Sequence, residues 1–146
     1  MKVLILLMTV MLETAMAMAG GEPSVIAPSY IINANNLSVV YQVQHADIKP
    51  QHKKFIQVKI KSVINPSKIS LSFNVYRLPI TGKKSFVGTF SLFPSDNPGN
   101  FIVATQGKFK IDDQVEVALD VIDAIDKNIN LQITIDSISM IDRFHE

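Results

Sequence analysis

The chain has 146 residues, a formal net charge of +1 from 14 basic and 13 acidic side chains, and no cysteine. The lack of cysteine excludes a disulfide framework, a cysteine-ligated zinc site, a thiol nucleophile and a lipid anchor on an N-terminal cysteine. The near-neutral charge also differs from the strongly basic balance that is typical of nucleic-acid-binding domains.

The first 19 residues have the three-part layout of a secretory signal peptide. Lys2 precedes an apolar run over residues 3–12, and Ala17 and Ala19 each end a small-x-small cleavage motif. The run is too short to span a bilayer, which needs about 20 residues. We therefore expect residues 1–19 to be removed and a secreted or periplasmic protein without a membrane span to remain. An uncleaved anchor and a buried first helix are the alternatives.

Residues 20–36 are expected to form an extended N-terminal arm, in which residues 29–32 can add an edge strand. Residues 37–146 alternate between apolar and polar side chains, which is the pattern of half-buried β-strands. The alternation predicts strands over residues 37–44, 56–61, 69–76, 86–92, 101–103, 115–121 and 129–135. Seven or eight short strands after a signal-peptide helix predict an all-β antiparallel β-sandwich.

Two details of this pattern bear on strand geometry. Residues 79–84 and 94–100 are rich in proline, glycine and asparagine and are predicted to be hairpin loops. In the last strand, the apolar residues move from odd positions to even positions after Asp136. A β-bulge near Asp136 and Ser137 explains this change, and the end of one strand followed by a second short strand explains it equally well.

Charge is distributed unevenly along the chain. Residues 44–84 contain nine basic side chains against one acidic side chain, and residues 112–146 contain nine acidic side chains against two basic ones. This asymmetry favours a dipolar surface and head-to-tail self-association. The alternative is that the two segments interleave in the fold, so that their charges mix.

Two groups of residues are candidates for binding a metal ion. His45, Asp47 and His52 lie in one predicted loop and offer the nitrogen and oxygen ligands that a divalent metal prefers. An acidic group offers oxygen ligands for calcium, and it consists of Asp112, Asp113, Asp120, Asp123 and Asp126. Solvent-exposed side chains without a bound ion are the alternative for both groups.

The sequence contains no catalytic motif. A nucleophile elbow, a phosphate-binding loop and a dinucleotide-binding glycine motif are all missing. We therefore expect a protein without enzymatic activity and without a cofactor.

Lysines and a tyrosine are candidates for surface binding. Lys59 and Lys61 lie on the polar side of one predicted strand, and Tyr76 lies on the polar side of the next. An anionic polysaccharide or lipid surface suits an exported protein better than a polynucleotide does. The alternative is that these residues form an ordinary solvated strand face. Asn36 begins an Asn-Leu-Ser sequence, which is the acceptor for N-glycosylation in a eukaryotic secretory pathway.

Three segments resemble the β-sandwich domain that follows the copper domain in tyrosinases and plant polyphenol oxidases. They are residues 73–76 (FNVY), 87–93 (VGTFSLF) and 131–138 (LQITIDSI). The histidine-rich copper domain of that family has no counterpart in this chain. The resemblance implies an accessory role beside a separate enzyme and assigns no catalytic residue.

Together these features predict an exported, non-catalytic binding or accessory module whose partner is an exported protein or a polysaccharide surface. A self-associating structural subunit is one alternative. A small metal-binding protein that uses His45, Asp47 and His52 is another.

Overall fold

The computed structural model describes residues 29–44, 55–105, 107, 109–120 and 126–142. These residues form eight β-strands and no α-helix, and so they include no helix with the length and apolar character needed to cross a bilayer. The strands are β1 (Tyr30–Asn33), β2 (Ser38–Gln42), β3 (Phe55–Ile64), β4 (Ser72–Leu78), β5 (Ser85–Ser91), β6 (Gly99–Ala104), β7 (Gln114–Asp120) and β8 (Gln132–Ile141). The all-β prediction is confirmed.

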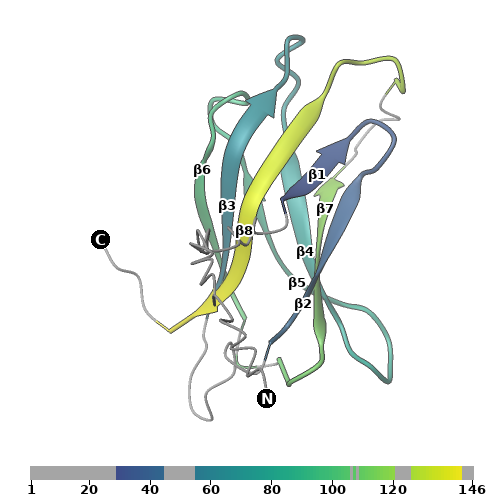
Figure 1. Cartoon of the computed structure of the whole chain (residues 1–146), viewed down its shortest axis with the longest axis vertical. Helices are drawn as coiled ribbons and strands as arrows, with labels where there is room; N and C mark the ends of the chain where they lie inside the picture. Colours follow the sequence, from purple (N-terminus) through teal and green to yellow (C-terminus); the bar gives the residue numbers. More distant parts are fainter. Residues whose placement is uncertain (1–28, 45–54, 106, 108, 121–125, 143–146) are drawn as a thin grey trace, which may run out of the picture.

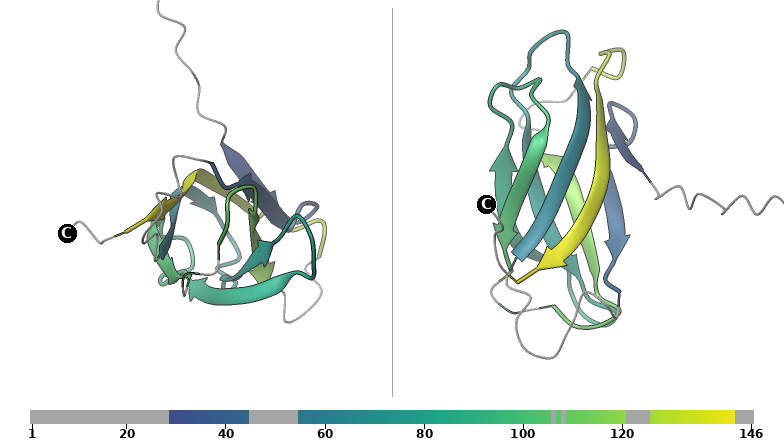
Figure 2. Two further views of the ribbon diagram at one scale, coloured as in Figure 1. Left: turned by 90° about the horizontal axis from the view of Figure 1, so that it is seen from below. Right: turned by 60° about the vertical axis from the view of Figure 1, so that its left-hand side comes forward.

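The strands form two antiparallel sheets that face each other (Figure 1). Sheet A has the strand order β1-β8-β3-β6, and sheet B has the order β2-β7-β4-β5. Figure 2 shows the same two layers of strands from below and turned about the vertical axis. The predicted antiparallel sandwich is therefore the observed architecture.

The core consists of the alternating apolar side chains of both sheets. Val115 and Val117 of β7 are fully buried, as are Ile133 and Ile135 of β8. Burial of an aliphatic side chain of this size contributes about 1.5–3 kcal/mol. Three aromatic rings join the sheets at one side, because Phe90 stacks on Phe73 at 4.9 Å and on Phe101 at 4.8 Å between ring centroids. Packing of this kind stabilises the fold without disulfides.

One of the two predicted hairpin loops is confirmed and the other is wrong. Residues 79–84 join β4 to its antiparallel neighbour β5. Residues 94–100 instead connect β5 in sheet B to β6 in sheet A. The two strands pack side by side without a hydrogen-bonded ladder, and a Cβ atom on Gly88 would lie only 2.7 Å from Cγ1 of Val103. Gly88 therefore permits the close approach of the two sheets at this edge.

The N-terminal strand β1 is an edge strand of sheet A, as expected for residues 29–32. Its residue Tyr30 pairs with Ile135 of β8. The chain then turns toward β2, and the Asn33 side-chain oxygen accepts the backbone N–H groups of Asn35 and Asn36, both at 2.9 Å. This turn carries the chain from sheet A to sheet B.

Strand β4 begins three residues later than predicted because the buried side chain of Asn65 holds the preceding segment. The Asn65 amide nitrogen donates to the carbonyl of Ile69 at 2.8 Å and to that of Ser95 at 3.1 Å. The amide oxygen of Asn65 accepts the N–H of Ile69 at 3.2 Å. Ile69 thus bonds to Asn65 with both of its backbone groups, and the β4 ladder starts at Ser72.

The predicted bulge in β8 is confirmed, and it faces a second irregularity in β3. Lys59 pairs with Ser137, Ile60 pairs with Ile135, and Ser62 pairs with Thr134. Asp136 and Lys61 are therefore both left out of the ladder. Strand β8 continues to Ile141, so the alternative of two separate short strands is wrong.

This double bulge reverses the buried phase of both strands at the same level. In β8 the buried side chains change from odd to even positions between Ile135 and Ile138. In β3 they lie at even positions up to Ile60, and the next apolar side chain packed on the core is Val63. A regular β8 that continued the phase of Ile133 and Ile135 would turn Ile138 and Met140 outward, so the bulges keep the apolar side chains inside.

Candidate binding site

The outer face of sheet B carries a row of large side chains from all four strands. Glu116 of β7 pairs with Val40 of β2 and with Tyr76 of β4, and Tyr76 pairs with Phe86 of β5. A register shift between Gly88 and Phe86 turns the Phe86 side chain outward, where it is 57% exposed.

The Tyr76 ring contacts Phe86 and Lys84 within this row. The Phe86 ring meets it edge to face, with 5.9 Å between the ring centroids. The ammonium group of Lys84 lies 4.0 Å from the centre of the Tyr76 ring and also pairs with Glu116. The prediction that Tyr76 lies on the polar side of its strand is confirmed.

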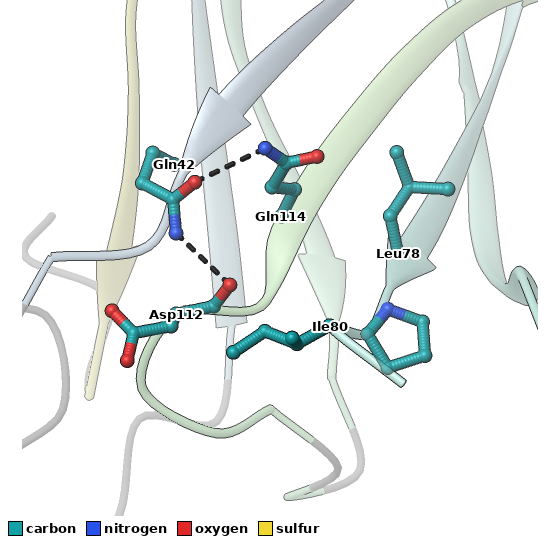
Figure 3. Close-up of a pocket in the computed structure, with 6 residues that line it drawn as sticks. Gln42, Leu78, Ile80, Asp112 and Gln114 are labelled. Atoms are coloured by element: carbon teal, nitrogen blue, oxygen red, sulfur yellow. Dashed lines mark hydrogen bonds between the residues drawn. The ribbon is translucent and has the colours of Figure 1, made fainter. Parts of the chain in front are cut away.

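A hollow of about 520 Å³ lies where strands β2, β4 and β7 end or begin (Figure 3). We call it the Gln114 hollow, and its lining residues are Gln42, Leu78, Pro79, Ile80, Asp112 and Gln114. The side-chain nitrogen of Gln114 donates to the side-chain oxygen of Gln42 at 3.1 Å. The side-chain nitrogen of Gln42 donates to the carbonyl of Asp112 at 2.9 Å. The two amides are thereby fixed relative to each other.

The Gln114 hollow combines an apolar wall with hydrogen-bond acceptors. Leu78, Pro79 and Ile80 form the wall, and the Ile80 side chain is 71% exposed. The side-chain acceptors left without a described partner are the oxygen of Gln114 and the carboxylate of Asp112. Both of these groups only accept hydrogen bonds. A ligand that fits the hollow must therefore present an apolar surface and hydrogen-bond donors.

A buried ion pair supports the floor of the hollow. Arg77 Nε donates to Oδ2 of Asp113 at 2.6 Å, and the same oxygen accepts the N–H of Lys110 at 2.7 Å. The carbonyl of Asp113 accepts the N–H of Val43 at 3.0 Å. The Asp113 side chain is only 5% exposed. Asp113 therefore ties the loop before β7 to both β2 and β4, which fixes Asp112 and Gln114.

The three residues predicted for surface binding do not form one surface. Lys59 and Lys61 lie on β3 in sheet A, whereas Tyr76 lies on β4 in sheet B. The Lys59 ammonium group lies 3.1 Å from a carboxylate oxygen of Asp136. The two lysines and the tyrosine thus face solvent from opposite sheets of the sandwich.

The structure separates the residues of the predicted calcium group. Asp112 and Asp113 precede β7, while Asp120 ends that strand seven residues after Asp113. At about 3.3 Å per residue the strand spans far more than one coordination sphere. Asp126 binds the N–H of Asn128 in a turn, and Asp123 lies outside the described residues. Within the described ranges, no three acidic or histidine side chains are close enough to share an ion.

The predicted histidine–aspartate metal site and the glycosylation acceptor differ in whether the structure describes them. His45, Asp47 and His52 all fall within residues 45–54, outside the described part of the chain, so their metal site stays a prediction. Asn36 is exposed, and its side-chain nitrogen donates to the carbonyl of Ile31 at 3.0 Å.

The uneven charges along the sequence mix in the fold. Lys59, Arg77 and Lys84 come from the basic segment and pair with Asp136, Asp113 and Glu116 of the acidic segment. A fourth basic residue, Lys68, pairs with Asp96. Of the two readings of the charge pattern, interleaving of the segments is the one observed.

Sequence reasoning missed most of the Gln114 hollow. In the sequence, Gln42 and Gln114 have the pattern of ordinary polar residues near the ends of strands. Neither segment alone indicates that the two strands pair. The one available signal was local. Leu78-Pro79-Ile80 places two large apolar residues around a proline at the start of a predicted loop, where polar residues are usual.

No family model, curated protein or solved structure matches the chain. The resemblance of three segments to the tyrosinase β-sandwich domain therefore stays a prediction.

Proposed function

We propose that the protein is an exported, non-catalytic binding module and that the Gln114 hollow binds a sugar unit of a neutral polysaccharide. A pyranose ring has apolar C–H faces and a rim of hydroxyl groups that donate hydrogen bonds. The hollow offers the complementary groups, namely the Leu78–Ile80 wall and the free acceptors of Gln114 and Asp112. The single observation that carries the proposal is this pairing of an exposed apolar wall with the fixed amide of Gln114.

The lining of the hollow supports binding rather than hydrolysis. Glycosidases need two carboxyl groups on opposite sides of the scissile bond. Asp112 is the only acidic residue among the described residues that line this hollow. Its neighbour Asp113 is buried and bonded to Arg77. The negative charge of Asp112 also favours a neutral ligand over an acidic one.

Affinity electrophoresis of the mature protein in gels containing neutral polysaccharides tests the proposal. Cellulose derivatives, xylan, mannan, starch and dextran sample the main linkages. We expect retardation by at least one of them. Gln114→Ala should weaken the binding about two- to tenfold, because it removes an acceptor and releases the Gln42 amide. Ile80→Asp should abolish the binding, because it replaces part of the apolar wall with a negative charge in addition to that of Asp112.

Gln132→Ala is the matched control. Gln132 is the first residue of β8, as Gln114 is the first residue of β7, but it lies in the other sheet. This variant should bind as the wild type does. Equal weakening by Gln114→Ala and Gln132→Ala, or no retardation by any of the polysaccharides, contradicts the proposal.

A further inference from the structure

The double bulge of β3 and β8 coincides with a second hollow, on the outer face of sheet A. We call it the Lys61 hollow. It has a volume of about 510 Å³ and is lined by Lys59, Ile60, Lys61, Pro98, Gly99, Asn100 and Asp136. The two unpaired residues of the bulges, Lys61 and Asp136, both belong to the lining. The irregular ladder and the hollow are thus one feature.

The bulges raise the number of polar side chains at this point of the sheet. In a regular strand only alternate residues face outward. Here Lys61 and Ser62 are both exposed, because Lys61 is left out of the ladder. Bulges re-aim side chains and are enriched beside functional sites. Asn100 of β6 pairs with Lys59 across the ladder, which brings its amide beside the lysines.

The hollow has an excess of positive charge. Lys59 pairs with Asp136, and both side chains remain accessible to water, at 55% and 40% exposure. Within the described part of the chain, Lys61 has no ion-pair partner. The Lys61 ammonium group is therefore free to donate to an anion, and Asn100 and Lys59 line the same hollow.

We propose that the Lys61 hollow binds a carboxylate or sulfate group of an acidic polysaccharide. The site lies on the opposite sheet from the Gln114 hollow, so this inference goes beyond the proposed function and does not depend on it. The excess positive charge of the hollow favours an anionic group over a neutral one. A polynucleotide fits less well because none of the described residues that line the Lys61 hollow carries an aromatic ring on which a base could stack.

Two charge changes of opposite sign test the site. The mature protein is titrated with polygalacturonate and with dextran sulfate at low salt, and uncharged dextran serves as the neutral probe. Lys61→Gln should weaken binding about two- to fivefold, which is the range for one exposed ionic contact. Asp136→Asn should strengthen binding by a similar factor, because it frees Lys59. Added salt should weaken the binding of all variants by screening.

Lys83→Gln is the matched control, since it removes the same charge from the exposed β4–β5 loop of the other sheet. Equal effects of Lys61→Gln and Lys83→Gln overturn the site, as does weaker binding by Asp136→Asn. Binding to vesicles of anionic lipid without binding to either acidic polysaccharide overturns the assigned ligand. Gln114→Ala should leave acidic-polysaccharide binding unchanged, which separates failure of this site from failure of the Gln114 hollow.

Discussion

At the scale of single residues, Asp113 and Gly88 show how local chemistry positions the candidate site. Asp113 is the only acidic side chain that is buried among the described residues. Its Oδ2 atom accepts hydrogen bonds from Arg77 and from the backbone N–H of Lys110. Gly88 has a different role, because it leaves room for Val103 where the two sheets meet. Each residue makes a separate contribution to stability.

Replacement of Asp113 by asparagine should lower the free energy of unfolding by about 2–3 kcal/mol. The change leaves the Arg77 guanidinium group without its counter-charge in a largely buried position. Urea denaturation measures the loss. Asp96→Asn is the control, because it breaks the exposed Lys68–Asp96 pair and should cost less than about 1 kcal/mol. Similar losses in the two variants would show that the Arg77–Asp113 pair has no special structural role.

Replacement of Gly88 by alanine should destabilise the protein by about 1–3 kcal/mol through overpacking against Val103. Val103→Ala alone should also destabilise it, because it leaves a cavity. The double variant should lose less than the sum of the two single variants, since the added methyl group then fills the space left by valine. Strict additivity in this double-mutant cycle would rule out the contact.

At the scale of elements, the double bulge shows how far the sequence predicts the sheets. The phase change in β8 was visible because Ile133, Ile135, Ile138 and Met140 are all apolar. The matching change in β3 was missed because the predicted strand ended at Lys61, before Val63 shows the new phase, whereas β3 continues to Ile64. Apolar periodicity predicts a strand well, but a strand predicted too short cannot show a change of phase beyond its end.

The pairing of strands could not be predicted from the sequence, for a different reason. The Gln114 hollow combines Gln42, Leu78 and Gln114 from three strands, and the ladders that join them link residues more than 30 positions apart. Alternation indicates which side chains face outward, and Tyr76 was placed correctly on that basis. The alternation carries no information on which strands are neighbours. Tyr76 was therefore grouped with Lys59 and Lys61, which lie in the other sheet.

Deletion of Lys61 and Asp136 together should leave a folded, cooperative sandwich. The remaining residues form a regular ladder in which Ile60 pairs with Ile135 and every apolar side chain keeps its phase. As a control, deletion of the paired residues Gln57 and Ser139 turns Ile56 and Met140 outward. That loss should be about 3–6 kcal/mol, from two exposed aliphatic side chains. Thermal unfolding followed by circular dichroism compares the two deletions. A Lys61/Asp136 deletion variant that is less stable than the Gln57/Ser139 deletion variant would contradict the proposed role of the bulges.

At the scale of the whole molecule, two sheets present different chemistry to solvent. Sheet B carries the Tyr76–Phe86 pair and the Gln114 hollow, and sheet A carries the Lys61 hollow. Cross-segment ion pairs such as Arg77–Asp113 neutralise much of the asymmetry along the chain. The two hollows, one on each sheet, are the surfaces that we propose for ligands.

The described fold begins ten residues after the predicted signal peptide, so cleavage removes none of the described strands. We expect intact-mass spectrometry of the exported protein to find an N-terminus at Met18 or Gly20, after one of the two small-x-small motifs. Recovery of the chain with Met1 still attached in the exported fraction would contradict this expectation.

The most direct test of the proposed binding site is an NMR titration of the ¹⁵N-labelled mature protein with oligosaccharides of the polysaccharide that retards it most. Backbone and side-chain amide signals report each contact separately. The account predicts that the largest shifts fall on Gln42, Leu78, Ile80 and Gln114, including both glutamine side-chain amides, while β3 and β8 stay unchanged. Shifts confined to the outer face of sheet A, or no shifts at saturating ligand, would contradict it.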